Sequence, residues 1–191
     1  MAGKTLNLPP AIANYVSVFV PRLGVNAKPG DEKKYSVVLT YPKAEAQKVL
    51  APLRAAALAV ADAKWPGKGA AIVKAMRWPV IADGDERLNG DGEPMFPGEF
   101  FVTAKRNESF GQPGVVDRKV QTILDPKEVY SGVTVIAQVN LYPYDNPLGG
   151  KGVGVGLNNL QVVKATPRRD GRIPAEEAFE EVPDEDGDSL L

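Results

Sequence analysis

The segment that most limits what this chain can fold into is Tyr130–Tyr142, because its apolar residues recur at every second position. A period of two is typical of a strand with one buried and one exposed face. The predicted buried face carries Val133, Val135, Ala137, Val139 and Leu141. The opposite face carries Thr134, Gln138, Asn140 and Tyr142, interrupted only by Ile136. A half-buried strand of this length needs partner strands, so the sequence predicts a sheet.

Four other segments have the composition of strands, and 17 prolines with 19 glycines favour turns between them over a helical bundle. We predict these strands at Tyr15–Arg22, Tyr35–Tyr41, Glu99–Arg106 and Val153–Lys164. In the first, Val16, Val18 and Val20 are expected on one side, with Tyr15, Ser17 and Phe19 on the other.

The period changes to that of a helix over residues 43–64, which are rich in alanine. Pro52 lies inside this pattern and either kinks the helix or begins a new one at its first turn. Residues 69–77 predict a second short helix, and residues 79–98 a long loop.

The charges divide the chain into two parts. Its 23 basic and 24 acidic residues nearly cancel, but residues 176–191 contain eight acidic residues and none that is basic. Without these eight, the body has 16 acidic against 23 basic residues, a net charge of about +7. A basic body suits a polyanionic partner, and a terminal block of like charge is typical of a disordered interaction tail.

Together these patterns predict a mainly β fold with an inserted helix. We expect an OB-type antiparallel barrel in residues 1–170 and a disordered acidic tail in residues 171–191. A β-sandwich with an inserted helix is the alternative.

The chain has no cysteine and no histidine, which removes thiolate chemistry, the Ser-His-Asp triad and the commonest zinc ligands. We therefore expect a protein that is not an enzyme and has no cofactor. No segment is apolar enough for a secretory signal or a membrane span, so we expect a cytoplasmic protein without membrane contacts.

Two motifs resemble ligand loops but fail their tests. The loop 83–93 has Arg87 and Leu88 where an EF-hand needs a ligand and a glycine. Asp83, Asp85 and Asp91 leave open a magnesium-dependent enzyme as an alternative function. Residues 149–156, GGKGVGVG, match neither phosphate-binding fingerprint and precede a strand, so Lys151 is expected to hold a phosphate at a hairpin tip.

Aromatic and basic residues alternate in a manner that single-stranded nucleic acid requires, because rings stack on bases while cations contact phosphates. We expect Phe19, Tyr35, Tyr41 and Trp78 in the core, and Tyr142 and Tyr144 on the surface. The candidate DNA-binding residues are Phe101, Lys105, Arg106, Phe110, Tyr142, Tyr144 and Lys151. Arg168 and Arg169 precede the tail as either a linker or a further phosphate clamp.

Several short motifs in order resemble a family of phage single-stranded DNA-binding proteins first catalogued as a domain of unknown function. The similarity runs over most of residues 12–165. It rests on Val139–Asn146 and Lys151–Gln161, together with 91–94, 96–104, 115–117 and 130–132.

The resemblance implies an OB-fold protein that coats single-stranded DNA during phage replication and recombination in the bacterial host, without catalysis. It also implies a tail that shields the DNA groove and contacts replication or recombination proteins. The tail residues expected to regulate binding are Glu180, Glu181, Asp184, Glu185, Asp186 and Asp188. Weaker duplex binding and a homodimer remain open, and a protein-only adaptor is a further alternative.

Overall fold

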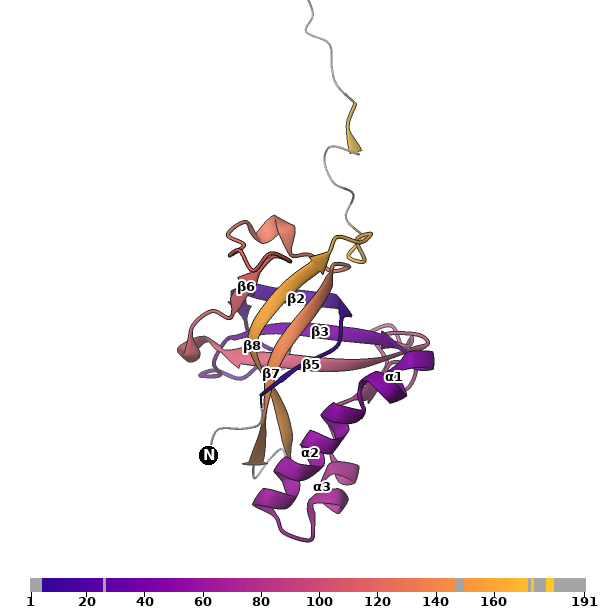
Figure 1. Ribbon diagram of the computed structural model, residues 1–191, viewed down its shortest axis with the longest axis vertical. Coiled ribbons are helices and arrows are strands. Elements are labelled where there is room, and N and C mark those ends of the chain that lie inside the picture. The colour runs from indigo at the N-terminus through magenta and orange to yellow at the C-terminus, as the bar shows by residue number, and fades with distance from the viewer. Residues whose placement is uncertain (1–4, 26, 147–149, 172, 174–177, 181–191) are drawn as a thin grey trace, which may run out of the picture.

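The computed structural model describes residues 5–25, 27–146, 150–171, 173 and 178–180. Its strands are β1 (Thr5–Asn7), β2 (Ala11–Arg22), β3 (Lys34–Pro42), β4 (Ala82–Asp83), β5 (Glu99–Asn107), β6 (Gly114–Val116), β7 (Thr134–Asn146) and β8 (Gly150–Lys164). Its helices are α1 (Lys43–Val49), α2 (Ala51–Lys64) and α3 (Gly69–Ala75), with single 3₁₀ turns at Glu108–Phe110 and Pro126–Glu128. Figure 1 shows the three helices together beside the strands.

Within the described residues, the pairings of five strands close into a ring in the order β2, β3, β5, β8, β7. The pairing of β2 with β7 completes the ring and is short, joining Ala11 to Val135 and Ile12 to Thr134. The strands form one sheet, as opposed to the two sheets of the β-sandwich alternative.

The sheet is not antiparallel throughout, which corrects the expectation from sequence. Strand β8 pairs in parallel with β5 at Lys105 and Gly156, and in parallel with β6 at Val115 and Leu160. The chain between β5 and β8 contains the whole of β7, and such a long connection allows β8 to return in the direction of β5.

The alternation predicted for β7 is confirmed, because Val135, Ala137, Val139 and Leu141 are all buried. The alternation predicted for β2 is wrong at Val20, which is 63% exposed. The register between β2 and β3 shifts on both sides of Ser17, so the period of two does not continue through the strand.

The predicted helical region divides at Leu50, and Pro52 lies in the first turn of α2. Proline has no N–H to donate to the preceding turn, but the first turn of a helix does not need that hydrogen bond. The structure therefore shows the second of the two predicted outcomes, a new helix with Pro52 in its first turn. Leu53, Ala56, Ala57 and Ala61 form the buried face of α2. This helix contacts β7 and β8, while α3 contacts β8 (Figure 1). In the described part of the chain, no helix has the length and apolar character needed to cross a bilayer.

Candidate nucleic-acid interface

The last residues of β7 and the first residues of β8 pair to form a two-stranded arm, residues 141–146 and 150–155. The pairing continues to Asn146 and Gly150, where the two strands end. On its outer face Tyr142 lies opposite Gly154, and Tyr144 lies opposite Gly152. Gly152 is therefore a strand residue, although the predicted strand began only at Val153; Gly154 and Gly156 lie in the strand as predicted.

The glycines leave space that the tyrosine rings occupy. A Cβ atom built on Gly154 would lie 2.5 Å from Cζ of Tyr142, and one on Gly152 would lie 2.4 Å from the hydroxyl oxygen of Tyr144. Each ring thus lies against the bare backbone of β8. Tyr142 remains 43% exposed. Burial against the strand, and then the proximity of Tyr144, raise the pKa of Tyr142.

The same face continues into the ring through Gly156, which lies opposite Asn140 and beside Lys105 of β5. A Cβ atom on Gly156 would lie 2.5 Å from Oδ1 of Asn140, so this glycine also accommodates a β7 side chain. The pKa of Lys105 is lowered, first because the ammonium group is partly desolvated and second because of the charge of Lys34. The structure therefore places Lys105 next to the strip that carries the two tyrosines.

Lys151 lies on the arm, where its Nζ is 3.7 Å from a carboxylate oxygen of Asp145 and its side chain is about half exposed. This weak surface pair leaves the ammonium group open to solvent. The tip of the hairpin, residues 147–149, is outside the described residues.

Arg106 points away from this strip and binds backbone instead. Its guanidinium donates hydrogen bonds to the carbonyl oxygens of Phe110 at 2.6 Å, Gly111 at 2.7 Å and Leu157 at 3.4 Å. It therefore fixes the loop after β5, and that loop presents Phe110 with its side chain 69% exposed.

Phe101 lies on the outer face of β5 and belongs to a row of three rings. Its ring is 5.2 Å from that of buried Phe96, which in turn makes an edge-to-face contact with Tyr15 at 6.0 Å. Tyr15 is 60% exposed and has a positive φ of 47°. Sequence reasoning placed Tyr15 on one side of a regular strand, and no sequence signal marks the irregular backbone that exposes it.

Trp78 was expected in the core but is 62% exposed, so that expectation is wrong. The guanidinium groups of Arg87 and Arg77 lie 4.7 Å and 5.6 Å from the centre of its ring. Tyr35 and Tyr41 are buried as predicted, and Phe19 packs against the core with part of its surface exposed.

The acidic loop binds a side chain of the protein itself. The ammonium group of Lys43 lies 2.6 Å from a carboxylate oxygen of Asp83 and 2.6 Å from one of Asp85. Asp85 also accepts the N–H of Gly98 at 2.9 Å. Among the described residues no group of three or more acidic side chains is arranged to hold a metal ion. Nothing in this geometry favours the metal-dependent enzyme.

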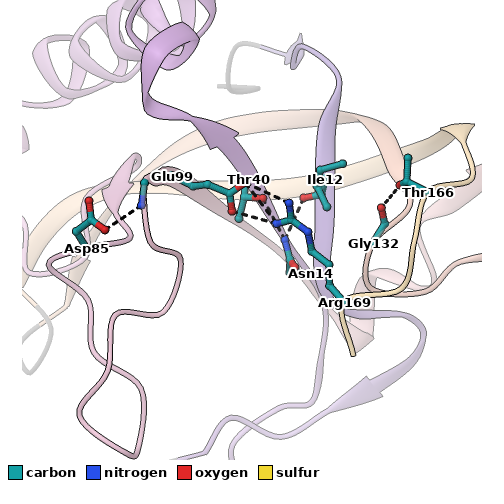
Figure 2. A network of polar contacts seen from close by, with 9 residues as sticks. Ile12, Asn14, Thr40, Asp85, Glu99, Gly132, Thr166 and Arg169 are labelled. Carbon is teal, nitrogen blue, oxygen red and sulfur yellow. Dashed lines mark hydrogen bonds and ion pairs between the residues drawn. The ribbon is translucent and has the colours of Figure 1, made fainter. Parts of the chain in front are cut away.

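The linker, residues 165–171, is attached to the body and not free of it. Arg169 pairs with Glu99 at 3.0 Å, and its N–H donates to the carbonyl oxygen of Ser131 at 2.7 Å. Figure 2 shows Arg169 pointing toward Glu99, and Thr166 bonded to Gly132. Arg168 pairs with Asp170 at 2.7 Å and lies 4.5 Å from the centre of the Tyr130 ring. Both arginines are therefore part of the linker's attachment.

Of the tail residues expected to regulate binding, the structure describes Glu180, which is exposed. Glu181, Asp184, Glu185, Asp186 and Asp188 lie outside the described residues.

A family model described as Enterobacter phage Enc34, ssDNA-binding protein, matches residues 9–190. No curated protein sequence matches the chain.

Solved structures of two phage proteins share the fold. The single-stranded DNA-binding protein of bacteriophage Enc34 in complex with ssDNA is 18% identical, with a TM-score of 0.67 over 86% of this chain and 89% of that chain. A second structure of the Enc34 protein, whose description names no ssDNA, is also 18% identical, with a TM-score of 0.66 over 92% of this chain and 90% of that chain. The single-stranded DNA-binding protein gp2.5 of bacteriophage T7 is 19% identical, with a TM-score of 0.58 over 98% and 100%.

Proposed function

Because the chain belongs to the family of the Enterobacter phage Enc34 ssDNA-binding protein, we propose that it binds and protects single-stranded DNA without catalysis during phage replication and recombination. It acts in the cytoplasm of the bacterial host. The solved Enc34 protein in complex with ssDNA supports this ligand class.

The five-strand ring is, in this proposal, an OB-type barrel whose outer face carries the DNA. Such barrels bind oligonucleotides across neighbouring strands and the loops beside them. The outer face of β5, which holds Phe101 and Lys105, meets β8 at Gly156, the residue directly after the arm. Single-stranded DNA crosses this junction between β5 and the arm.

The observation that carries the proposal is the pair of tyrosine rings laid over the glycines of β8, with Lys105 beside the same strip. Exposed rings supported by a neighbouring strand are suited to stacking on bases of any DNA sequence. Tyr142, Tyr144 and Phe101 stack on bases, while Lys105 and Lys151 contact phosphates. Arg106 acts indirectly, because it holds the loop that presents Phe110.

The acidic tail competes with DNA for the cationic face and recruits replication or recombination proteins, consistent with the division of charge in the sequence. Duplex DNA binds more weakly, through phosphate contacts alone, since paired bases are not free to stack on the rings.

The proposal is tested by fluorescence anisotropy with a labelled thymidine oligonucleotide. We expect Tyr142→Ala with Tyr144→Ala to weaken binding by about 1–3 kcal/mol for each ring that stacks. Tyr142→Phe with Tyr144→Phe keeps both rings and should retain most of the affinity. Leu124→Ala, at a residue 83% exposed, is the control for a general surface change. Undiminished affinity of a folded double alanine variant would exclude this face as the DNA site.

A further inference from the structure

Next to the outer face lies a cavity of about 690 Å³, between β2, the loop before β5 and the linker. Its lining includes Asn14, Tyr15, Phe96, Glu99, Ser131 and Arg169. The polar network that borders it is drawn in Figure 2, where Asn14, Thr40, Glu99 and Arg169 come together from three strands and the linker. The site described above does not use this cavity.

We infer that the cavity receives a base of the bound DNA and that Tyr15 stacks on it. This inference rests on the proposed function and extends the interface to a residue that sequence reasoning did not select. It follows from the backbone of Tyr15, the charge of the cavity rim and the row of rings that links the cavity to Phe101.

The backbone of Tyr15 shows that its exposure is built into the strand. A positive φ is unfavourable for a residue with a Cβ atom, and such residues persist where the surrounding structure requires them. Here the residue is a large aromatic whose side chain is 60% exposed, supported from one side by Phe96. Packing in the core therefore does not explain why an aromatic residue occupies position 15.

The charges on the rim favour a neutral ligand. Arg169 is paired with Glu99 at 3.0 Å, and Asp170, which also lines the cavity, is paired with Arg168 at 2.7 Å. The cations of the rim are thus balanced by carboxylates, so the cavity offers little surplus charge for a phosphate. A base is planar and neutral, and Asn14 and Ser131 provide polar atoms for its edge.

The cavity is continuous with the proposed DNA face. The Asn14 amide donates a hydrogen bond to the Thr40 hydroxyl at 3.2 Å, and Thr40 lies opposite Phe101 in the pairing of β3 with β5. The Phe101 ring contacts Phe96, which contacts Tyr15. DNA that stacks on Phe101 therefore has a second ring, the exposed Tyr15, on the far side of Phe96, on which another of its bases can lie.

The test uses Tyr15→Gly in the full chain, with binding measured by anisotropy on the thymidine oligonucleotide. Glycine adopts a positive φ readily, so the variant should melt at or above the wild-type temperature while lacking the ring. We expect its affinity to fall by about 5- to 150-fold, the range for one stacked base. Tyr15→Phe should bind within twofold of the wild type.

The matched control is Val120→Gly, because Val120 is also exposed and also has a positive φ, of 64°. It should resemble Tyr15→Gly in stability and leave affinity unchanged. Tyr15→Asn, which tolerates the same backbone, replaces Tyr15→Gly if the glycine variant unfolds.

The outcomes separate this inference from the proposed function. If the wild type binds the oligonucleotide and folded Tyr15→Gly or Tyr15→Asn binds within twofold of it, the inference is wrong while the proposed function stands. An equal loss of affinity in Val120→Gly would also overturn it. If the wild type does not bind at all, the proposed function itself fails.

Discussion

Lys43 pairs with two carboxylates of the acidic loop 83–93. The sequence showed aspartates grouped near glycines, which suits either a metal site or a turn. A lysine forty positions earlier in the chain binds Asp83 and Asp85, and sequence spacing alone does not reveal such a contact. The hydrogen bonds from Lys43 lower the pKa of both carboxyl groups.

We expect Lys43→Met to raise the pKa of Asp83 and Asp85 toward their ordinary values. Because both pKa values are lowered in the folded protein, the two carboxylates stabilise it above the unfolded value of about 3.9, and this contribution is lost as the pH falls through the folded values. The variant should therefore show less of this loss below about pH 4. Carboxyl titration by NMR measures the shift, with Lys48→Met, another α1 lysine, as control. Unchanged titration of both groups would contradict the assigned contact.

Among the helices and strands, the sequence predicts most accurately those whose pattern depends on residues close together in the chain. The alternation of β7 is local and was found in the structure, and of the two outcomes predicted for Pro52 the structure shows the new helix. Strands β1 and β6 have three residues each, too few to establish a period. The predicted strand at Val153–Lys164 begins three residues after the start of β8 and leaves out Gly152, which here makes room for the Tyr144 ring across the ladder.

The residue types of the candidate site come from the sequence, and their arrangement comes from the structure. Lys105 lies next to the strip that carries Tyr142 and Tyr144. The engagement of Arg106 with carbonyl groups and the exposure of Tyr15 depend on contacts between segments distant in the sequence.

We expect Gly154→Ala to displace the Tyr142 ring, because the added Cβ would lie 2.5 Å from Cζ. The ring should become more exposed, and the pKa of Tyr142 should fall toward its ordinary value of about 10. Ultraviolet titration of the phenolate measures that shift, and DNA affinity should fall with it. Gly90→Ala, where a Cβ meets nothing within 4 Å, is the control. An unshifted titration would show that Gly154 does not position the ring.

For the whole molecule, the basic body makes binding sensitive to salt. Each phosphate neutralised on single-stranded DNA adds about 0.7 to the slope of log affinity against log salt concentration. We expect Lys105→Gln to reduce that slope by about 0.7. Lys127→Gln, in the 3₁₀ turn before β7, should leave it unchanged. Equal slopes for the wild type and Lys105→Gln would remove Lys105 from the phosphate contacts.

We also expect a chain ending after Ala175 to bind single-stranded DNA more tightly at low salt, because it lacks the eight acidic residues of 176–191. The difference should shrink as salt screens the charges. Anisotropy at several salt concentrations measures it. Equal or weaker binding by the shortened chain would exclude competition by the tail. The cut leaves the linker intact, including the pairing of Arg169 with Glu99.

The short pairing of β2 with β7 also has a consequence for biosynthesis. Ala11 and Val135 are 124 positions apart, so at about 5–20 residues per second the ribosome needs roughly 6–25 s to supply the partner of β2. During that interval one edge of β2 has no strand beside it, a condition that invites pairing between nascent chains. The register of β2 against β3 shifts around Ser17, and Pro21 lies near the end of β2, so the strand itself is irregular. Bulges and prolines discourage pairing at strand edges, so we expect the irregular β2 that exposes Tyr15 to limit association of unfinished chains.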